Sequence, residues 1–119
     1  MIRALAAAAL LPLAAAASDP LAGRVAGPMQ SCLSISRTAA PEIIDGKTIL
    51  YRDGARIYRA QIDACPGLTT FSTLIVEVYG PQMCRGDRFR AVTLPSSIPS
   101  AYCRFRGFVP YTKVKARTG

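Results

Sequence analysis

Hydrophobic and polar positions alternate in several short runs of the chain, and such alternation predicts half-buried β-strands. Residues 32–36 (CLSIS) and 87–94 (DRFRAVTL) each place apolar side chains on one face and polar side chains on the other, and residues 105–111 predict a short final strand. Beyond residue 17, no segment of helical length keeps a 3.6-residue period. The pattern therefore predicts an all-β fold, a small antiparallel barrel or sandwich of five or six short strands.

The clearest local element is a β-hairpin between residues 48–52 (TILYR) and 55–61 (ARIYRAQ). Asp53 and Gly54 stand between the two runs, and Asp-Gly favours a type I′ turn because both of its central residues need positive φ. This register pairs Ile49 with Tyr58. One face of the predicted hairpin then carries the side chains that we expect to point inward: Ile49, Tyr51, Tyr58 and Ala60.

Residues 71–79 (FSTLIVEVY) are apolar on both faces. A strand of this kind is typical of the middle of a sheet, so we predict a central strand here. Glu77 is its one charged residue, and it requires a cationic partner or water.

The first 17 residues have the pattern of a secretory signal peptide. Met1-Ile2-Arg3 supplies a positive start, and residues 4–17 are almost wholly Ala and Leu. Ala15 and Ala17 fit the small residues that signal peptidase requires. We therefore expect a signal helix that is cleaved after Ala17, with an uncleaved N-terminal anchor as the alternative.

The remainder of the chain divides by composition. Residues 18–30 predict a flexible lead-in, residues 31–112 a disulfide-stapled β domain, and residues 113–119 a basic tail. We predict no transmembrane segment in the mature chain. The expected location is the periplasm or the exterior of a Gram-negative bacterium.

Four cysteines follow the predicted signal, and none of them forms a Cys-x-x-Cys pair. An even number of cysteines in an exported chain favours disulfides over a zinc site or redox chemistry. Three connectivities are possible. We favour the nested one, Cys65–Cys84 inside Cys32–Cys103, because it would clamp the ends of the domain; in the loop-entropy model each bridge contributes roughly 3–4.5 kcal/mol.

An ordered set of short motifs resembles an uncharacterised family of small, secreted, four-cysteine proteobacterial proteins, a domain-of-unknown-function family. The resemblance spans most of the chain from Cys32 to Tyr111, and one departure is that Arg106 stands where the family tends to have glycine, with Gly107 following. It implies an exported compartment and a fold plan without an established activity. The motifs that carry it are Cys32-Leu33, Ile44-Asp45, residues 48–51, Tyr58-Arg59, residues 65–68, residues 84–87, Cys103 and residues 108–111.

The sequence CRGDRF at residues 84–89 contains Arg-Gly-Asp, a tripeptide that many adhesion ligands present. In the resembled family the pattern is Cys-x-Gly-Asp, which leaves Arg85 at a free position. We therefore interpret Gly86 and Asp87 as a structural turn, in which Gly86 permits the backbone conformation and the Asp87 carboxylate binds amides where the next strand begins.

Catalytic chemistry has few candidates in this chain. It has no histidine, which excludes Ser-His-Asp and Cys-His catalysis and histidine metal sites. Ser-Lys catalysis would need one of only three lysines, and among the carboxylates only Glu77 lies in an apolar strand. We therefore predict no enzymatic activity, no catalytic residue, no metal and no cofactor.

The strongest remaining signal is positive charge. The chain has 15 Lys+Arg and 7 Asp+Glu, and removal of Arg3 with the signal leaves 14 − 7 = +7 on the mature side chains. Such a surface attracts anionic polymers or lipid headgroups in a salt-sensitive way, while solubility and an arginine-rich genome are the simpler explanation. The candidates for an anion-binding outward face are Arg52, Arg59, Arg88 and Arg90.

Two function classes follow from this sequence. The first is a non-catalytic periplasmic binding or structural module of unknown ligand, which contacts an anionic envelope polymer through its arginine-rich face. The alternative is an inhibitor or accessory partner of another exported protein. Nucleic acid is disfavoured because we expect no platform of outward-facing aromatic side chains among those arginines on which bases could stack.

Overall fold

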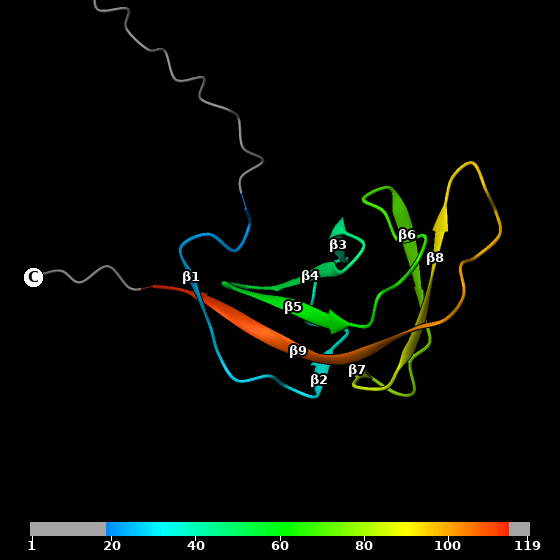
Figure 1. The fold of residues 1–119 in the computed structure, drawn as a ribbon. Coiled ribbons are helices and arrows are strands. Elements are labelled where there is room, and N and C mark those ends of the chain that lie inside the picture. Colours follow the sequence, from blue (N-terminus) through cyan, green and yellow to red (C-terminus); the bar gives the residue numbers. More distant parts are fainter. Residues whose placement is uncertain (1–18, 115–119) are drawn as a thin grey trace, which may run out of the picture.

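The computed structural model describes residues 19–114, which form β-strands joined by turns and loops (Figure 1). The all-β fold is therefore confirmed, while the predicted signal helix at residues 1–17 lies outside the described residues. The strands are β1 (Arg24–Ala26), β2 (Cys32–Ser34), β3 (Glu42–Asp45), β4 (Thr48–Asp53), β5 (Arg56–Ile62), β6 (Ser72–Val76), β7 (Gln82–Cys84), β8 (Arg88–Thr93) and β9 (Cys103–Lys113).

Six of these strands follow one another across a single antiparallel sheet in the order β3-β4-β5-β9-β8-β6. The strand β1 adds to β9, and β2 and β7 form a separate antiparallel pair. The sheet curls, so that β6 and β8 stand across from β3 and β4 (Figure 1). The result is a small, nearly closed barrel, in agreement with the predicted architecture.

The core fills the interior of this curled sheet. The four hairpin side chains predicted to point inward are all buried, and Phe89, Phe105 and Phe108 pack with them. Phe89 and Phe105 have ring centroids 4.6 Å apart, and Phe105 and Phe108 5.3 Å apart. Aromatic side chains bury large apolar areas, so these rings supply much of the stabilisation of a domain this small.

The hairpin of β4 and β5 has a different register from the predicted one. Ile49 lies opposite Ala60 rather than Tyr58, and Asp53 ends β4 as the partner of Arg56. The turn therefore consists of Gly54 and Ala55, and positive φ at the first of them alone (59° at Gly54) matches a type II′ turn. The register differs by two positions, which is the period of a strand, and this is why the inward face is nevertheless predicted correctly.

The strand β6 lies at the end of the sheet, so the prediction of a central strand at residues 71–79 is wrong. Its side chains alternate: Leu74 and Val76 are half-buried against the core, whereas Thr73 and Ile75 are exposed. The central position belongs to β9, whose 11 residues pair with β5, β8 and β1. The sequence predicts only a short strand there.

The lead-in predicted as flexible at residues 18–30 contains β1 and further backbone contacts. The Gly27 amide donates to the Pro110 carbonyl at 2.8 Å, and Gln30 and Phe108 exchange two backbone hydrogen bonds. Backbone hydrogen bonds to β9 hold this segment in place, so it forms a strand without a hydrophobic period of its own. Lys113, predicted in the basic tail, is the last residue of β9, and residues 115–119 lie outside the described residues.

Both disulfides are present, but the nested connectivity is wrong: the bonds are Cys32–Cys84 and Cys65–Cys103. The antiparallel pairing of β2 with β7 places Cys32 directly opposite Cys84. The antiparallel pairing of β5 with β9 ends at Ile62 and Phe105, which brings Cys65 beside Cys103 just beyond it. Strand order, which the cysteine spacing does not contain, decides the pairing.

Candidate functional site

The structure divides the four predicted anion-binding arginines into two pairs. Arg52 and Arg59 lie on β4 and β5, whereas Arg88 and Arg90 lie on β8, with β9 between them. Arg52 forms an ion pair with Glu42 at 3.5 Å. Arg59 is half-buried, and its Nε is buried without a hydrogen-bond partner among the described residues. The first pair is therefore a poor surface for an anion.

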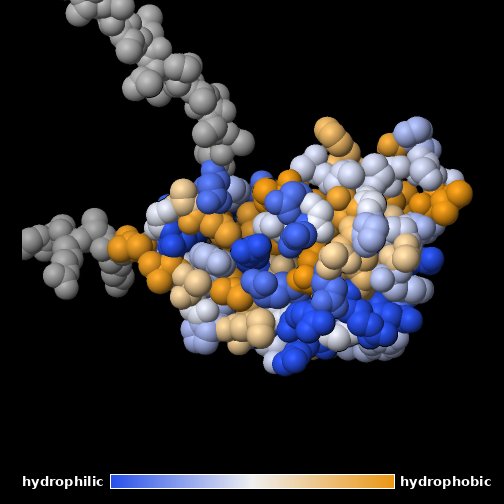
Figure 2. Space-filling model, in the orientation of Figure 1, coloured by the Kyte–Doolittle hydropathy of each residue, from blue (hydrophilic) through white to orange (hydrophobic). Residues whose placement is uncertain are grey.

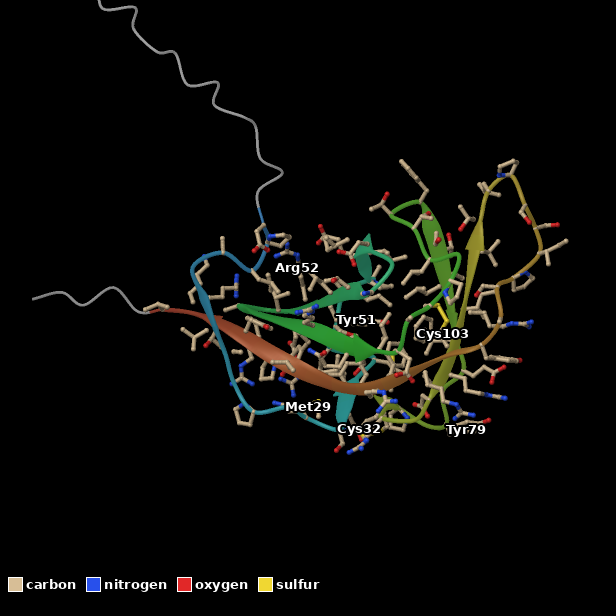
Figure 3. The ribbon with its side chains drawn as sticks, in the orientation of Figure 1. Met29, Cys32, Tyr51, Arg52, Tyr79 and Cys103 are labelled. Atoms are coloured by element: carbon tan, nitrogen blue, oxygen red, sulfur yellow. A yellow bond between two sulfur atoms is a disulfide. The ribbon has the colours of Figure 1, made fainter. Side chains whose placement is uncertain are left out.

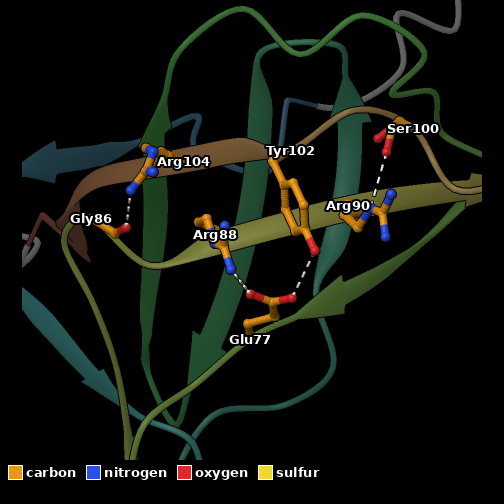
Figure 4. Close-up of polar contacts among 7 residues, drawn as sticks. All are labelled: Glu77, Gly86, Arg88, Arg90, Ser100, Tyr102 and Arg104. Atoms are coloured by element: carbon orange, nitrogen blue, oxygen red, sulfur yellow. Dashed lines mark hydrogen bonds and ion pairs between the residues drawn. The ribbon is translucent and has the colours of Figure 1, made fainter.

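The second pair meets a tyrosine. Phe89 and Ala91 turn into the core, so the alternation of β8 sends Arg88 and Arg90 outward on one face. Their guanidinium carbons lie 4.3 Å and 4.5 Å from the centroid of the Tyr102 ring, within cation–π distance. Figure 4 shows the ring standing between the two side chains. Both faces of Tyr102 are thus occupied.

A carboxylate fixes this arrangement. Glu77 accepts a hydrogen bond from Arg88 at 2.8 Å and one from the Tyr102 hydroxyl at 3.1 Å (Figure 4). The hydrogen bonds from Tyr102 and Arg88 lower the pKa of Glu77 below its ordinary value. Glu77 therefore stays ionised at neutral pH and cannot donate a proton as a general acid.

A third arginine completes the group that we call the Arg–Tyr cluster: Glu77, Arg88, Arg90, Tyr102 and Arg104. Arg104 lies directly opposite Arg88 in the β8–β9 ladder. It donates to the Gly86 carbonyl at 3.1 Å, and Arg90 Nε donates to the Ser100 carbonyl at 3.2 Å. Neither has a carboxylate partner among the ion pairs of the described residues.

The charge of the cluster is therefore three cations against one anion, or +2. Because a guanidinium carries five N–H donors, Arg90 and Arg104 each keep donors that the protein does not use. In Figure 2, strongly hydrophilic side chains gather over the region where β7 and the start of β8 lie. The cluster can accept an anion without breaking an existing ion pair at either of these two arginines.

The turn next to the cluster is built as the sequence pattern suggests. The Asp87 amide donates to the Cys84 carbonyl at 3.0 Å, and Gly86 has a φ of 92°, as the third residue of a type II turn requires. The Asp87 carboxylate accepts a hydrogen bond from the Cys84 amide at 2.7 Å. The Asp87 carboxylate is therefore engaged within its own turn, and the Arg-Gly-Asp tripeptide has no free carboxylate to present to a receptor.

Three cluster residues are absent from the four arginine candidates: Glu77, which the sequence predicts to need a cationic partner, Tyr102 and Arg104. Phe89, between Arg88 and Arg90 in the sequence, points into the core, and the loop before β9 supplies the aromatic ring that lies between the two arginines on the outer face. The only sequence signal for Tyr102 is a lone tyrosine beside a cysteine. Its role depends on the pairing of β8 with β9 and is visible only in three dimensions.

Other chemistry finds little support within residues 19–114. This part of the chain holds no group of three or more His, Cys, Asp or Glu side chains that could bind a metal ion. It also holds no helix with the length and apolar character needed to cross a bilayer.

Comparisons with known proteins give no relative: no family model, no curated protein and no solved structure matches this chain. The resemblance to the four-cysteine family therefore stays a prediction that rests on the motifs quoted above.

Proposed function

We propose that this chain is a non-catalytic binding module of the periplasm or cell exterior that holds an anionic envelope polymer on its Arg–Tyr cluster. The observation that carries the proposal is the pair of guanidinium groups stacked on one tyrosine beside a third, with a single carboxylate among them. Stacking restricts the arginine side chains before binding, so less entropy is lost when an anion arrives.

The chemical class of ligand follows from guanidinium geometry. A planar guanidinium donates two parallel hydrogen bonds to a phosphate, sulfate or carboxylate. Three such groups on one surface suit a polymer that repeats its charge, as phosphorylated or acidic envelope glycans do. Nucleic acid remains disfavoured, because Arg88 and Arg90 already cover both faces of the ring on which a base would stack.

The location rests on separate arguments. Two disulfides are typical of proteins that fold in an oxidising, extracytoplasmic compartment. The signal-like pattern of residues 1–17 and the family resemblance support export from a Gram-negative cytoplasm.

The test is retention on immobilised heparin and on lipopolysaccharide vesicles over a salt gradient. We expect Arg90→Gln combined with Arg104→Gln to weaken binding roughly tenfold, because each removed guanidinium takes away charge-assisted hydrogen bonds. Arg52→Gln combined with Arg56→Gln removes the same charge from the β4–β5 hairpin and serves as the matched control.

Equal weakening by both double variants would show that only net charge matters, and the proposed site would be wrong. Salt-independent co-purification of one stoichiometric exported protein would instead favour the accessory-partner function.

A further inference from the structure

The end of the barrel where β6 begins and β8 ends is built from two segments without charge. Residues 64–76 and residues 91–103 contain no Asp, Glu, Lys or Arg, although 18% of the whole chain is charged. The ladder of β6 with β8 joins these segments, because Ser72 lies opposite Thr93. The two hydroxyl groups share a hydrogen bond of 2.6 Å. A surface that lacks charge is therefore concentrated at one end of a strongly basic protein.

Three large hydrophobic side chains project into solvent at this end, and we call them the apolar tip. Phe71 is 84% exposed, Leu94 is 81% exposed and Ile98 is 78% exposed. The first two flank the pair that ends the β6–β8 ladder, and Ile98 lies in the loop before β9. Figure 2 shows apolar side chains protruding where this loop turns and β6 begins (Figure 1). Single exposed hydrophobic residues are common, but three together on a charge-free surface indicate an interaction site.

The backbone at the apolar tip is already supplied with hydrogen-bond partners. The Phe71 amide donates to Thr69 Oγ1 at 3.2 Å, and the Ile98 amide donates to Ser96 Oγ at 3.1 Å. An amide that enters an apolar phase must be paired within the protein, because no water is present to replace its partner. Local side chains therefore prepare these turns for contact with an apolar phase.

Cations stand behind the apolar tip on the same outward face of β8. Arg90 is four residues before Leu94, which corresponds to about 13 Å at about 3.3 Å per residue. An interfacial segment enters a membrane by about 5–10 Å, and each headgroup layer is about 5–8 Å deep. If the tip enters a bilayer with β8 upright, the Arg90 guanidinium therefore meets the headgroups.

We propose that the apolar tip inserts into the outer part of a lipid bilayer whose surface carries anionic headgroups. The tip supplies apolar side chains to the acyl region, while the Arg–Tyr cluster supplies cations to the headgroups one layer above. A second copy of this chain would bring a further net-positive surface to the cluster, whereas an anionic membrane brings the opposite charge. This inference rests on the proposed function, because the cations that meet the headgroups are those of the cluster.

Insertion can be measured directly, because the chain contains no tryptophan and an introduced one reports only its own surroundings. Phe71→Trp and Ile98→Trp place this probe at the tip. Tyr79→Trp places it beyond the other end of β6, where Tyr79 is 81% exposed (Figure 3). Each disulfide-bonded mature chain is mixed with vesicles of phosphatidylglycerol and phosphatidylcholine in equal parts. We expect the emission of both tip probes to shift to shorter wavelength and to be quenched by lipids brominated on their acyl chains, and the Tyr79 probe to stay unchanged.

The contribution of the apolar tip to affinity is measured by co-sedimentation with the same vesicles. We expect the triple variant Phe71→Ser, Leu94→Ser and Ile98→Ser to bind vesicles at least about tenfold more weakly, because apolar area no longer leaves water. Its retention on heparin should equal that of wild type, since heparin offers no apolar phase. The matched control replaces three exposed apolar residues of the β1 end, and it should bind vesicles as wild type does: Val25→Ser, Met29→Ser and Val114→Ser.

The heparin measurement separates this inference from the proposed function. Wild type that binds heparin but not the vesicles would overturn the membrane site and leave the proposed function standing. Wild type that binds neither would remove both. Loss of vesicle binding and heparin retention together in Arg90→Gln with Arg104→Gln is expected, because both ligands need the cluster.

Three further outcomes would contradict insertion by the tip: vesicle binding that the triple serine variant retains, equal loss in the Val25–Met29–Val114 control, or an equal emission shift at Tyr79→Trp. Sedimentation velocity without lipid tests a different occupant. A wild-type dimer that the triple variant converts to a monomer would assign the tip to a second copy of the chain. Melting curves establish that each variant is folded, and the two tryptophan probes report insertion even if the triple variant fails to fold.

Discussion

Glu77 shows how one carboxylate can hold a cationic surface together while limiting its charge. It accepts hydrogen bonds from Arg88 and Tyr102, and it reduces the cluster from +3 to +2. Its side chain is about one-third exposed (34%), so water screens the ion pair and its direct contribution to stability is small. Its larger effect is on how strongly the cluster attracts an anion.

Replacing Glu77 with Gln should therefore strengthen anion binding. The change keeps the side-chain shape and removes the only negative charge of the cluster. We expect several-fold tighter retention on heparin at low salt, and no difference near 1 M salt, where the Debye length is about 3 Å. Glu42→Gln, next to Arg52, is the control. Weaker binding by Glu77→Gln would mean that orientation of Arg88 outweighs charge, contrary to this expectation.

The same residue gives a pH dependence with a definite sign. The pKa of Glu77 is lowered from 4.5 by its bonds to Tyr102 and Arg88, so the stabilisation is complete above the ordinary value and is lost as the pH falls through the lowered one. We expect wild type to melt above Glu77→Gln at pH 7. Melting curves should converge as the pH falls below 4.5. A gap that widens in acid would contradict this assignment.

Asp87 should behave as a structural residue. Asp87→Ala leaves the half-buried Cys84 amide without its acceptor, and a hydrogen bond to a charged group is worth about 1.5–3 kcal/mol. We expect a loss of that size in the free energy of unfolding by denaturant. The exposed Asp63, paired with Arg106, provides the comparison, and Asp63→Ala should cost less than about 1 kcal/mol. Equal losses would remove the special role of Asp87.

These residues also show which side-chain contacts can be predicted from the sequence alone. The turn at Gly86 and Asp87 is local, so four consecutive residues predict it. Tyr102 reaches Arg88 and Arg90 only because β8 and β9 pair, so no local pattern predicts the contact. The hydroxyl of Tyr51, which is buried without a hydrogen-bond partner among the described residues, is equally unpredictable from the sequence. Alternation predicts that the ring is buried, but it does not predict what surrounds the hydroxyl oxygen.

Among the elements, β9 is the strand that pairs with β1, β5 and β8, and its ladder with β5 is irregular at one point. Gln61 of β5 lies opposite Gly107, whereas Ile62 lies opposite Phe105, so Arg106 is the extra residue of a β-bulge. Gly107 has a φ of 148°, which side-chain-bearing residues rarely adopt. The displaced glycine noted beside Arg106 in the sequence therefore belongs to a bulge within a strand.

We expect Gly107→Ala to destabilise the protein by about 1–3 kcal/mol, mainly through backbone strain. A Cβ there would also lie 2.6 Å from Met29 Sδ. Met29 is 54% exposed and labelled at the surface in Figure 3, so its side chain can move away. Denaturant unfolding of Gly107→Ala, Met29→Ala and the double variant separates the two causes. Full recovery in the double variant would show that the clash, and not the strain, is responsible.

Element positions were predictable to different degrees for physical reasons. The β4–β5 hairpin and β8 have clean alternation and turn residues, so their positions follow from the sequence. Residues 71–79 are apolar on both faces, a pattern typical of central strands, yet β6 ends the sheet and leaves Ile75 of its outer face exposed. The strand β1 has no hydrophobic period from which it could be predicted, because pairing with β9 is what holds it in place.

At the scale of the whole molecule, the two disulfides are not equivalent. Cys65 and Cys103 are 4% and 6% exposed and belong to the core, whereas Cys32 and Cys84 are half-buried. Loop entropy assigns each bond about 4 kcal/mol for separations of 38 and 52 residues. The sequence predicts that four cysteines stabilise an exported domain, but which pairs form depends on the completed sheet.

Replacing both Cys65 and Cys103 with Ala should lower the free energy of unfolding by about 4 kcal/mol or more, because loss of the crosslink adds to a cavity in the core. The matched variant, Cys32→Ala with Cys84→Ala, should lose less. Denaturant unfolding of both double variants measures the difference. A larger loss for the Cys32–Cys84 variant would contradict the ranking by burial.

The interlaced connectivity has a consequence for biosynthesis. In both bonds one cysteine is skipped along the chain: Cys32 passes over Cys65 to reach Cys84, and Cys65 passes over Cys84 to reach Cys103. A chain oxidised progressively from its N-terminus would first join Cys32 to Cys65, and this bond must then be broken by attack of a free thiolate. For a chain exported as predicted, we therefore expect maturation to require a disulfide isomerase, or oxidation that waits until all four thiols have emerged.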